Sequence, residues 1–107
     1  MSLLSLGKIE CAVGTIIETS LNQARKPAYC LTIDFGSHGI RQSSAQLTES
    51  YDEKDLINRQ VIAVINLPVK RVAGFKSEVL VLAAVDPMLG TRLISPDTQV
   101  PNGTIIA

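Results

Sequence analysis

Tryptophan is absent from this sequence, and the two phenylalanines and two tyrosines make up only 4% of the residues. Proteins that bind single-stranded nucleic acid commonly stack its bases on aromatic side chains. The chain therefore has few stacking platforms. If it binds nucleic acid, recognition of the shape and phosphates of a folded RNA suits this composition better than readout of unstacked bases.

An excess of charge of either sign is also absent, because ten Lys and Arg residues balance ten Asp and Glu residues. A domain that coats nucleic acid without specificity is usually much more basic. Contact with a polyanion must therefore come from a local cationic patch and not from the net charge.

Cysteine and histidine are too scarce for a metal site or a catalytic centre. Cys11 and Cys30 stand apart, with no C-x-x-C motif and no histidine at metal-ligand spacing, so we predict reduced, structural thiols and no cofactor. Cys11 is expected to be buried, and Cys30 is expected on the face opposite Leu31 and Ile33. His38 is the only histidine and lies in a glycine-flanked turn, where a structural role is favoured. Ser43-Ser44 lacks the G-x-S-x-G pattern of a hydrolase. The sequence predicts a protein without catalytic residues.

Long apolar runs are missing as well, since no segment approaches the roughly 18 consecutive residues of a membrane span. The start of the chain lacks the basic and apolar regions of a signal peptide. We therefore expect no membrane insertion and a cytoplasmic location. Hydrophobic residues make up 46% of the 107 positions, which predicts a single folded domain over residues 1–107.

The residues that are present favour strands. Residues 8–17 alternate in polarity and are interrupted at Gly14, which predicts a strand that is bent or bulged there. Residues 28–35 alternate cleanly, with Tyr29, Leu31, Ile33 and Phe35 on one face, and residues 40–47 form a more polar strand. Residues 60–67 and 77–85 are continuous apolar runs, typical of central strands covered on both faces or of buried helices.

One helix is expected, over Asp52–Asn58. Thr48 or Ser50 can cap its start, acidic residues fill its first turn and Arg59 closes its end, which suits the helix dipole. The order is then three strands, a helix and two strands. That order predicts an all-β fold, an OB-fold five-stranded barrel with one short helix between strands 3 and 4, although other small barrels and sandwiches share the pattern.

A cationic segment lies between the two apolar runs. Lys70, Arg71 and Lys76 are expected in a loop displayed by a rigid scaffold, the usual place for binding residues. The alternative is a hairpin loop that only keeps the protein soluble and has no binding role. Arg25 and Lys26 form a second small cluster, which is either a flanking contact or surface decoration. The polar strand that contains Arg41, Ser43, Ser44 and Gln46 is either an open hydrogen-bonding face or an edge strand.

Three segments, "IDFGSHGIRQSSAQLTESY", "LINRQVIAVINLPVKRVAGFKSEVLVLAA" and "PDTQVPNGTIIA", resemble the CsaA family of export-related chaperones. They are similar, more loosely, to the tRNA-binding domain of methionyl-tRNA synthetases. The pattern N-x-x-x-K-x-x-x-G-x-x-S-[EQ] of the wider family falls on five positions, and S-S-A-Q at 43–46 narrows the match to CsaA-like members. The five positions are Asn66, Lys70, Gly74, Ser77 and Glu78.

The resemblance implies an OB-fold whose terminal segments build a homodimer. It implies binding of tRNA by shape, without catalysis. It also implies binding of unfolded or exported polypeptides at an apolar cleft, where Phe75 would be a wall or would simply plug the barrel end. The turn Gly36–Gly39 is one residue shorter than is usual in the family. We expect the dimer interface in residues 2–10 and in the tail, where Val100, Ile105 and Ile106 lack an obvious strand partner.

For tRNA, the cations of residues 70–76 would supply charge, and Asn66 and Ser77 would supply hydrogen bonds. Gly74 and Glu78 would shape the loop, with Glu78 accepting loop amides or pairing with a basic side chain. The further candidate contacts are Arg25, Lys26, Arg41, Ser43 and Gln46. The sequence alone leaves open whether tRNA or polypeptide is the ligand in the cell.

Overall fold

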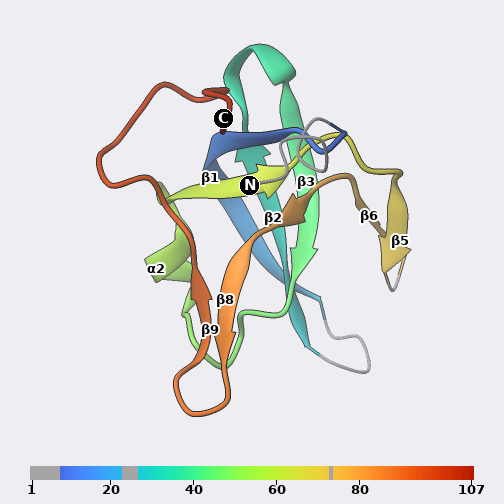
Figure 1. Cartoon of the computed structure of the whole chain (residues 1–107). Helices are drawn as coiled ribbons and strands as arrows, with labels where there is room; N and C mark the ends of the chain where they lie inside the picture. The colour runs from blue at the N-terminus through green and yellow to red at the C-terminus, as the bar shows by residue number, and fades with distance from the viewer. Residues whose placement is uncertain (1–7, 23–26, 73) are drawn as a thin grey trace.

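The computed structural model of the chain describes residues 8–22, 27–72 and 74–107. Five strands form one antiparallel sheet in the order β3-β2-β1-β4-β7. In the chain, a 3-10 turn, Gly36–His38, joins β2 to β3, and the helix α2, Glu53–Leu56, joins β3 to β4 (Figure 1). The strands are β1 Cys11–Asn22, β2 Ala28–Asp34, β3 Ile40–Ala45, β4 Gln60–Val64 and β7 Leu80–Val81. The expected all-β OB-type fold is confirmed, with its short helix between the third and fourth strands.

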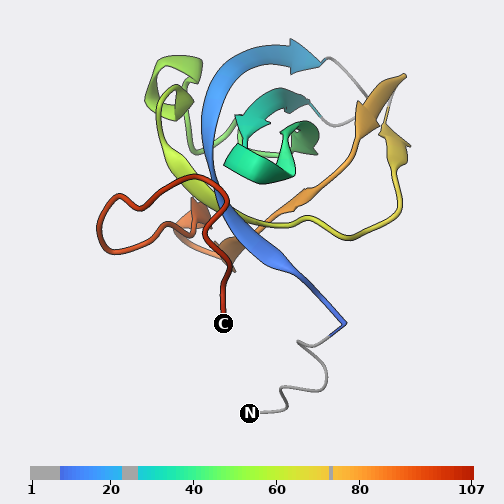
Figure 2. The same ribbon diagram turned by 90° about the horizontal axis from the view of Figure 1, so that it is seen from above.

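The sheet curls because β1 serves two neighbours in succession. Its first part, from Cys11 to Thr15, pairs with β4, and from Thr15 onward it pairs with β2. The register with β2 shifts between Ile16 and Glu18, and this bulge sharpens the bend. Figure 2 shows β1 arching around the interior of the molecule. The result is a curled, half-closed barrel.

Of the two alternatives predicted at Gly14, a bend or a bulge, the bulge is wrong. Gly14 pairs regularly with Val61, and the bulge lies further along the strand. Space explains the glycine, because a Cβ atom at this position would stand 2.6 Å from Ile33 Cγ2 and 2.7 Å from Phe35 Cδ1. The missing side chain lets the Phe35 ring pack directly on β1.

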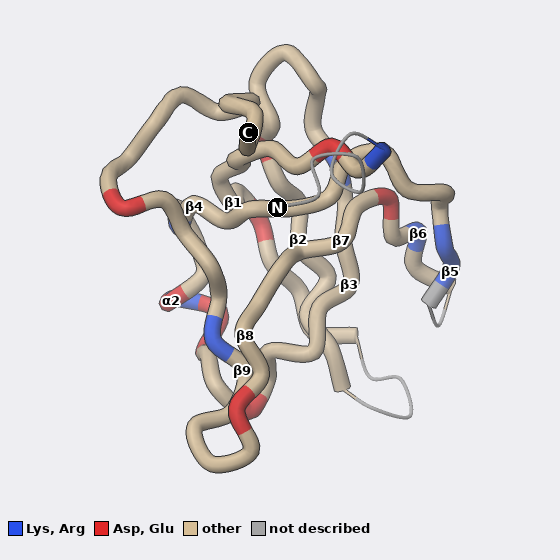
Figure 3. Tube along the Cα trace, viewed as in Figure 1, with Lys and Arg blue, Asp and Glu red and all other residues tan. Residues whose placement is uncertain are grey.

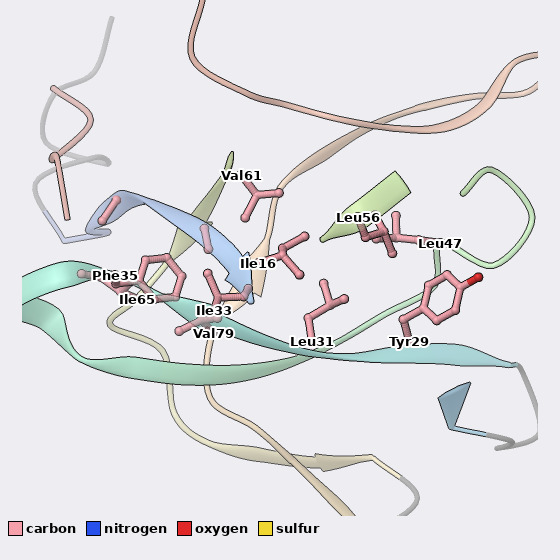
Figure 4. Close-up of a cluster of buried hydrophobic side chains, with 12 residues drawn as sticks. Ile16, Tyr29, Leu31, Ile33, Phe35, Leu47, Leu56, Val61, Ile65 and Val79 are labelled. Carbon is pink, nitrogen blue, oxygen red and sulfur yellow. The ribbon is translucent and has the colours of Figure 1, made fainter. Parts of the chain in front are cut away.

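The core lies inside the curl. The predicted inward face of β2 is confirmed, since Tyr29, Leu31, Ile33 and Phe35 are all buried. Leu56 of α2 is fully buried in the same cluster (Figure 4). Burial of side chains of this size is the main favourable term in folding a domain of this length.

The helix is shorter than expected and starts differently. It spans Glu53–Leu56, and its N-cap is Asp52 instead of Thr48 or Ser50. The Asp52 backbone N–H donates to Asp55 Oδ2 over 3.2 Å, the reciprocal bond of a capping box. The expected closing role of Arg59 is confirmed, because its Nε donates to the Asp55 carbonyl oxygen.

The apolar run at residues 77–85 is not one central strand. It is divided among β6 (Phe75–Ser77), β7 and β8 (Ala83–Asp86), and β8 leaves the sheet to form a hairpin with β9 (Gly90–Leu93). Leu80 and Val85 are 51% and 78% exposed, so apolar composition here does not mean burial. In the other apolar run, β4 is central as predicted, paired with β1 on one side and β7 on the other.

The tail has a strand partner at Ile105 and Ile106, which corrects the expectation for these two residues, whereas Val100 lies in no strand. Ile105 forms an antiparallel bridge with Ala12, and the Ile106 N–H donates to the Cys11 carbonyl over 2.9 Å. The Val100 N–H donates to Gln60 Oε1. The C-terminal segment therefore extends the sheet beside the first part of β1.

Both cysteines carry free thiols, as expected, and Cys11 is buried as predicted. Cys30 is buried as well, although it was expected on the face opposite Leu31 and Ile33. The short turn after β2 is also formed as predicted, with Gly36 at φ 61° and Gly39 at φ 87°. A side chain at Gly36 would collide with the Asn102 carbonyl oxygen, so the turn packs against the tail.

Candidate nucleic-acid interface

The three expected cations lie on a hairpin and not in a loop, which corrects the sequence prediction. The strands β5, Lys70–Val72, and β6, Phe75–Ser77, form a separate two-stranded sheet, and Gly74 turns the chain at φ 82°. Lys70, Arg71 and Lys76 are all exposed. Figure 3 shows their positive charge gathered at this edge of the molecule. We call β5 and β6 the cationic hairpin.

Two of these cations face each other across the hairpin. Arg71 and Lys76 are direct partners in the β5–β6 register. Like charges at opposed positions destabilise a two-stranded ribbon. In the part of the chain that the structure describes, no acidic side chain forms an ion pair with either residue. An anion bound between them would relieve this repulsion.

Polar side chains attach the base of the cationic hairpin to the outer edge of β3. The Glu78 N–H donates to the Gln42 carbonyl over 2.7 Å, and the Gln42 N–H donates to Glu78 Oε1 over 3.1 Å. The Ser44 N–H donates to Ser77 Oγ over 3.1 Å. Glu78 thus accepts a backbone amide, as the sequence suggests, but from β3 and not from its own loop. These bonds take the place of a regular strand ladder between β3 and residues 77–78, where the two ends of the curled sheet come close together.

Ser43 completes this closure from inside. Its hydroxyl donates to the Val79 carbonyl oxygen over 2.9 Å, and the side chain is 1% exposed. β3 is therefore a polar edge strand whose hydrogen-bonding groups bond to residues 77–79 of the same chain. The predicted contact of Ser43 with tRNA stays a prediction, and its burial gives the residue a clear structural role.

Asn66 also has a structural role. Its Oδ1 accepts the Glu10 N–H over 2.8 Å, and its Nδ2 donates to the Lys8 carbonyl over 2.9 Å. The side chain thus fixes the segment that leads into β1. Within the N-x-x-x-K-x-x-x-G-x-x-S-E pattern, the asparagine, serine and glutamate hold the scaffold, whereas Lys70 is left exposed. Sequence reasoning missed this division, because pattern and spacing do not reveal hydrogen-bond partners.

The other candidate contacts are dispersed. The Arg41 guanidinium is half-buried, where Nε donates to the His38 carbonyl over 3.1 Å and Nη1 donates to the Ile65 carbonyl over 3.2 Å. Gln46 is exposed after the end of β3 and lines a different hollow. Arg25 and Lys26 lie outside the described residues. Among the described candidates, the structure brings together the three cations of the hairpin and Ser77, which is the partner of Lys70 in the β5–β6 register.

A small hollow opens beside the cationic hairpin, where the sequence predicts an apolar cleft. Its volume is about 120 Å³. Phe75, the expected wall, is half-buried on β6 and does not line it. The lining residues are Leu67, Pro68, Lys70, Ser77, Glu78, Val79 and Leu80.

The described residues include no cluster of three or more His, Cys, Asp or Glu side chains that could hold a metal ion. Over the same residues, no helix has the length and apolar character needed to cross a membrane. The site therefore consists of exposed cations, backbone groups and one small apolar hollow.

Comparison with known proteins agrees with this geometry. Residues 11–105 match the family model described as a putative tRNA binding domain. Over 99 residues the chain is 32% identical to the methionine–tRNA ligase of Methanococcoides burtonii. The aligned region covers 92% of this chain but only 14% of that ligase. The chain thus spans about a seventh of the curated relative it matches.

Two solved structures resemble the chain over its full length. The chaperone CsaA from Bacillus anthracis str. Ames is 42% identical, with a TM-score of 0.93 and coverage of 100% of this chain and 98% of that one. The CsaA chaperone protein from Picrophilus torridus is 44% identical, with a TM-score of 0.92 and coverage of 100% and 99%. Taken with the family match, these likenesses show that the chain belongs to the tRNA-binding domain family and, within it, to the CsaA type.

Proposed function

We propose that this protein binds folded tRNA through the cationic hairpin, by contacts to phosphates and without catalysis. The observation that carries the proposal is the exposure of Lys70, Arg71 and Lys76 on one hairpin, with no acidic partner among the described residues. Phosphate contacts position a nucleic acid without reading its sequence. The bound RNA is therefore selected by shape. We place this activity in the cytoplasm.

Electrostatics support a phosphate ligand in particular. Arg71 and Lys76 repel each other across the hairpin, and a phosphate between them would turn that repulsion into two charge-assisted hydrogen bonds. The net charge of zero means that no diffuse attraction substitutes for the hairpin. Removing these cations should therefore remove most of the affinity.

The direct test is charge reversal on the hairpin. In the double variant Lys70→Glu/Arg71→Glu we expect tRNA affinity to fall by about 100-fold or more, since each lost charged contact costs roughly 1.5 kcal/mol. The matched control is Arg92→Glu, an exposed arginine on strand β9, which should bind tRNA as the wild type does. Affinity is measured by filter binding at fixed salt, with circular dichroism to check folding.

If the folded double variant binds tRNA as tightly as the wild type, the hairpin is only a solvated surface element and the proposal is wrong. If Arg92→Glu weakens binding as much as the double variant, attraction is diffuse and the hairpin is not the site.

Polypeptide binding is the second candidate function. The hollow of about 120 Å³ beside the hairpin favours it, because Leu67 and Leu80 on its wall are 40% and 51% exposed. The two similar structures are also described as chaperones. Leu67→Ser/Leu80→Ser should weaken binding of a reduced, alkylated unfolded protein and leave tRNA affinity unchanged. Unaltered binding of the unfolded protein by this variant would refute the hollow as its site.

We also propose a homodimer built by the terminal segments. Ile105 and Ile106 keep 51% and 42% of their surface exposed although their backbone is bonded to β1, and Ile9 is 41% exposed. A second copy that covers these side chains would bury an apolar surface that the monomer leaves in water. Light scattering at micromolar concentration should report twice the mass of one chain. A mass near 11.5 kDa would contradict the dimer.

A further inference from the structure

The β8–β9 hairpin presents large apolar side chains to solvent. Val85, Met88 and Leu89 are 78%, 92% and 66% exposed around its tip. Single exposed apolar residues are ordinary on protein surfaces, but three within five positions of one hairpin concentrate apolar surface on one element, as at an interaction site. Neither tRNA binding nor the hollow beside the cationic hairpin uses this patch.

The tip is held in a fixed shape. Asp86 Oδ2 accepts the Met88 N–H over 2.8 Å and the Leu89 N–H over 2.7 Å. An aspartate that accepts hydrogen bonds from the backbone amides two and three residues later in the chain holds the turn in a fixed shape. Met88 and Leu89 are therefore displayed on an ordered element, which lowers the entropy cost of binding through them.

One edge of β8 is open within the described part of the chain. The Leu93 N–H donates to the Tyr51 hydroxyl over 3.0 Å and so does not bond to β8, which makes Leu93 and Ala83 a pair without ladder hydrogen bonds. Such pairs alternate with bonded pairs along an antiparallel ladder, so Val85 and Thr91 form the next one. The Val85 N–H and carbonyl therefore point away from β9.

A hollow of about 520 Å³ lies between this hairpin and residues 46–50. Among its described lining residues the charged ones are Glu49 and Asp86, both acidic. Their charge repels phosphate and attracts a basic group.

We propose that the β8–β9 hairpin docks an extended segment of a protein partner that carries large apolar and basic side chains. The segment adds as a strand to the open edge of β8, where it bonds to the Val85 backbone. Its apolar side chains cover the patch of Val85, Met88 and Leu89, and a basic side chain enters the hollow beside Glu49. This proposal does not depend on tRNA binding, because the two surfaces differ in charge and in residues.

The probe is a fluorescein-labelled ten-residue peptide that alternates lysine with valine or leucine. A matched peptide carries glutamate in place of each lysine. Anisotropy measures the affinity of both peptides for the wild type, for Met88→Ser/Leu89→Ser and for Glu49→Lys. Ile40→Ser is the control variant, because Ile40 is a 60% exposed apolar residue that lies outside the hairpin and the hollow. Amide exchange at Val85 reports strand addition directly.

We expect the lysine peptide to bind the wild type and to slow exchange at the Val85 amide. Met88→Ser/Leu89→Ser should weaken this binding by about tenfold or more, since two large apolar side chains lose their cover. Glu49→Lys should weaken the lysine peptide and strengthen the glutamate peptide. Ile40→Ser should change neither, and all variants should keep wild-type tRNA affinity.

Four results would overturn the proposal. They are the absence of lysine-peptide binding to the wild type at millimolar concentration, equal binding of both peptides, unchanged affinity in the tip variant, and unchanged exchange at Val85 in the complex. If the tip variant instead halves the mass found by light scattering, the patch is covered by a second copy of this chain, and the docking of a different protein is also refuted.

Discussion

Two hairpins project from the same curled sheet, close together in sequence but opposite in chemistry. The cationic hairpin, residues 70–77, carries Lys70, Arg71 and Lys76 without described acidic partners. The β8–β9 hairpin, residues 83–93, shows apolar side chains at its tip and acidic ones in the adjoining hollow. Although the net charge is zero, the cationic hairpin and the β8–β9 hairpin thus form two surfaces suited to different ligands. Under the proposals above, one small domain would bind RNA at the cationic hairpin and a protein segment at the β8–β9 hairpin, on separate surfaces.

The hairpins differ in how they are attached as well. Side chains supply most of the bonds that hold the cationic hairpin to β3, through Ser43, Ser77 and Glu78, beside one backbone bond from the Glu78 N–H to the Gln42 carbonyl. Backbone bonds hold the other hairpin, with the Leu82 N–H donating to the Ile62 carbonyl, and Tyr51 adds one side-chain bond. A point mutation can therefore loosen the first attachment more easily than the second.

Loss of the Ser43 hydroxyl should give the largest stability effect. Ser43→Ala leaves the buried Val79 carbonyl without its donor, and we expect the free energy of unfolding to fall by about 1–3 kcal/mol. Urea denaturation measures it. Ser37→Ala, at an exposed turn position, should change that free energy by less than about 0.5 kcal/mol. Equal effects of the two variants would remove Ser43 from the attachment.

Tyr51→Phe should loosen the other hairpin by less. The Leu93 N–H loses its acceptor but can reach water, so we expect a loss of about 0.5–1.5 kcal/mol in the free energy of unfolding. Amide exchange should speed up at Leu93 and stay unchanged at Lys70 and Ser77. Faster exchange across both hairpins would show that their attachments are not independent.

The smallest effect concerns pH at the tip of the β8–β9 hairpin. The Leu89 and Met88 amides donate to the Asp86 carboxylate and hold its pKa below the ordinary value. The turn is thus stabilised above the unfolded pKa of about 3.9 and loses that stabilisation as pH falls through the lowered folded pKa. The amide NMR shifts of Met88 and Leu89 should change with pH at a midpoint below the ordinary pKa of an aspartate. Titration at the ordinary pKa, or persistence of the same titration in Asp86→Asn, would contradict this assignment.

Alternation predicted which face of β2 is buried, whereas the order of the elements left several small β folds open and the family resemblance selected the OB-fold. The face of Tyr29, Leu31, Ile33 and Phe35 follows from period two, and the helix follows from its charged ends. The 77–85 run was not predictable in this way, because apolar composition does not say that Val85 stays exposed. Position 85 belongs to a hairpin outside the sheet, and only three-dimensional pairing determines that.

The candidate site shows the same limit. The position of the cations between two apolar runs predicted their exposure, since charged residues in such a place face solvent. The roles of Asn66, Ser43 and Ser77 depend on partners 33 to 58 residues away in sequence, which no local pattern encodes. The exposed cations could thus be predicted from the sequence, whereas the hydrogen bonds that attach their hairpin to the sheet could not.

The salt dependence of tRNA binding tests the division between the hairpins most directly. Each phosphate contact contributes a slope of roughly −0.7 to −0.9 to a plot of log affinity against log salt concentration, so three contacts give about −2 to −3. Lys70→Gln/Arg71→Gln/Lys76→Gln should bring the slope close to zero, and Arg92→Gln should leave it unchanged. A folded triple variant that keeps the wild-type slope would show that the phosphates are bound elsewhere, and the assignment of RNA to the cationic hairpin would fail.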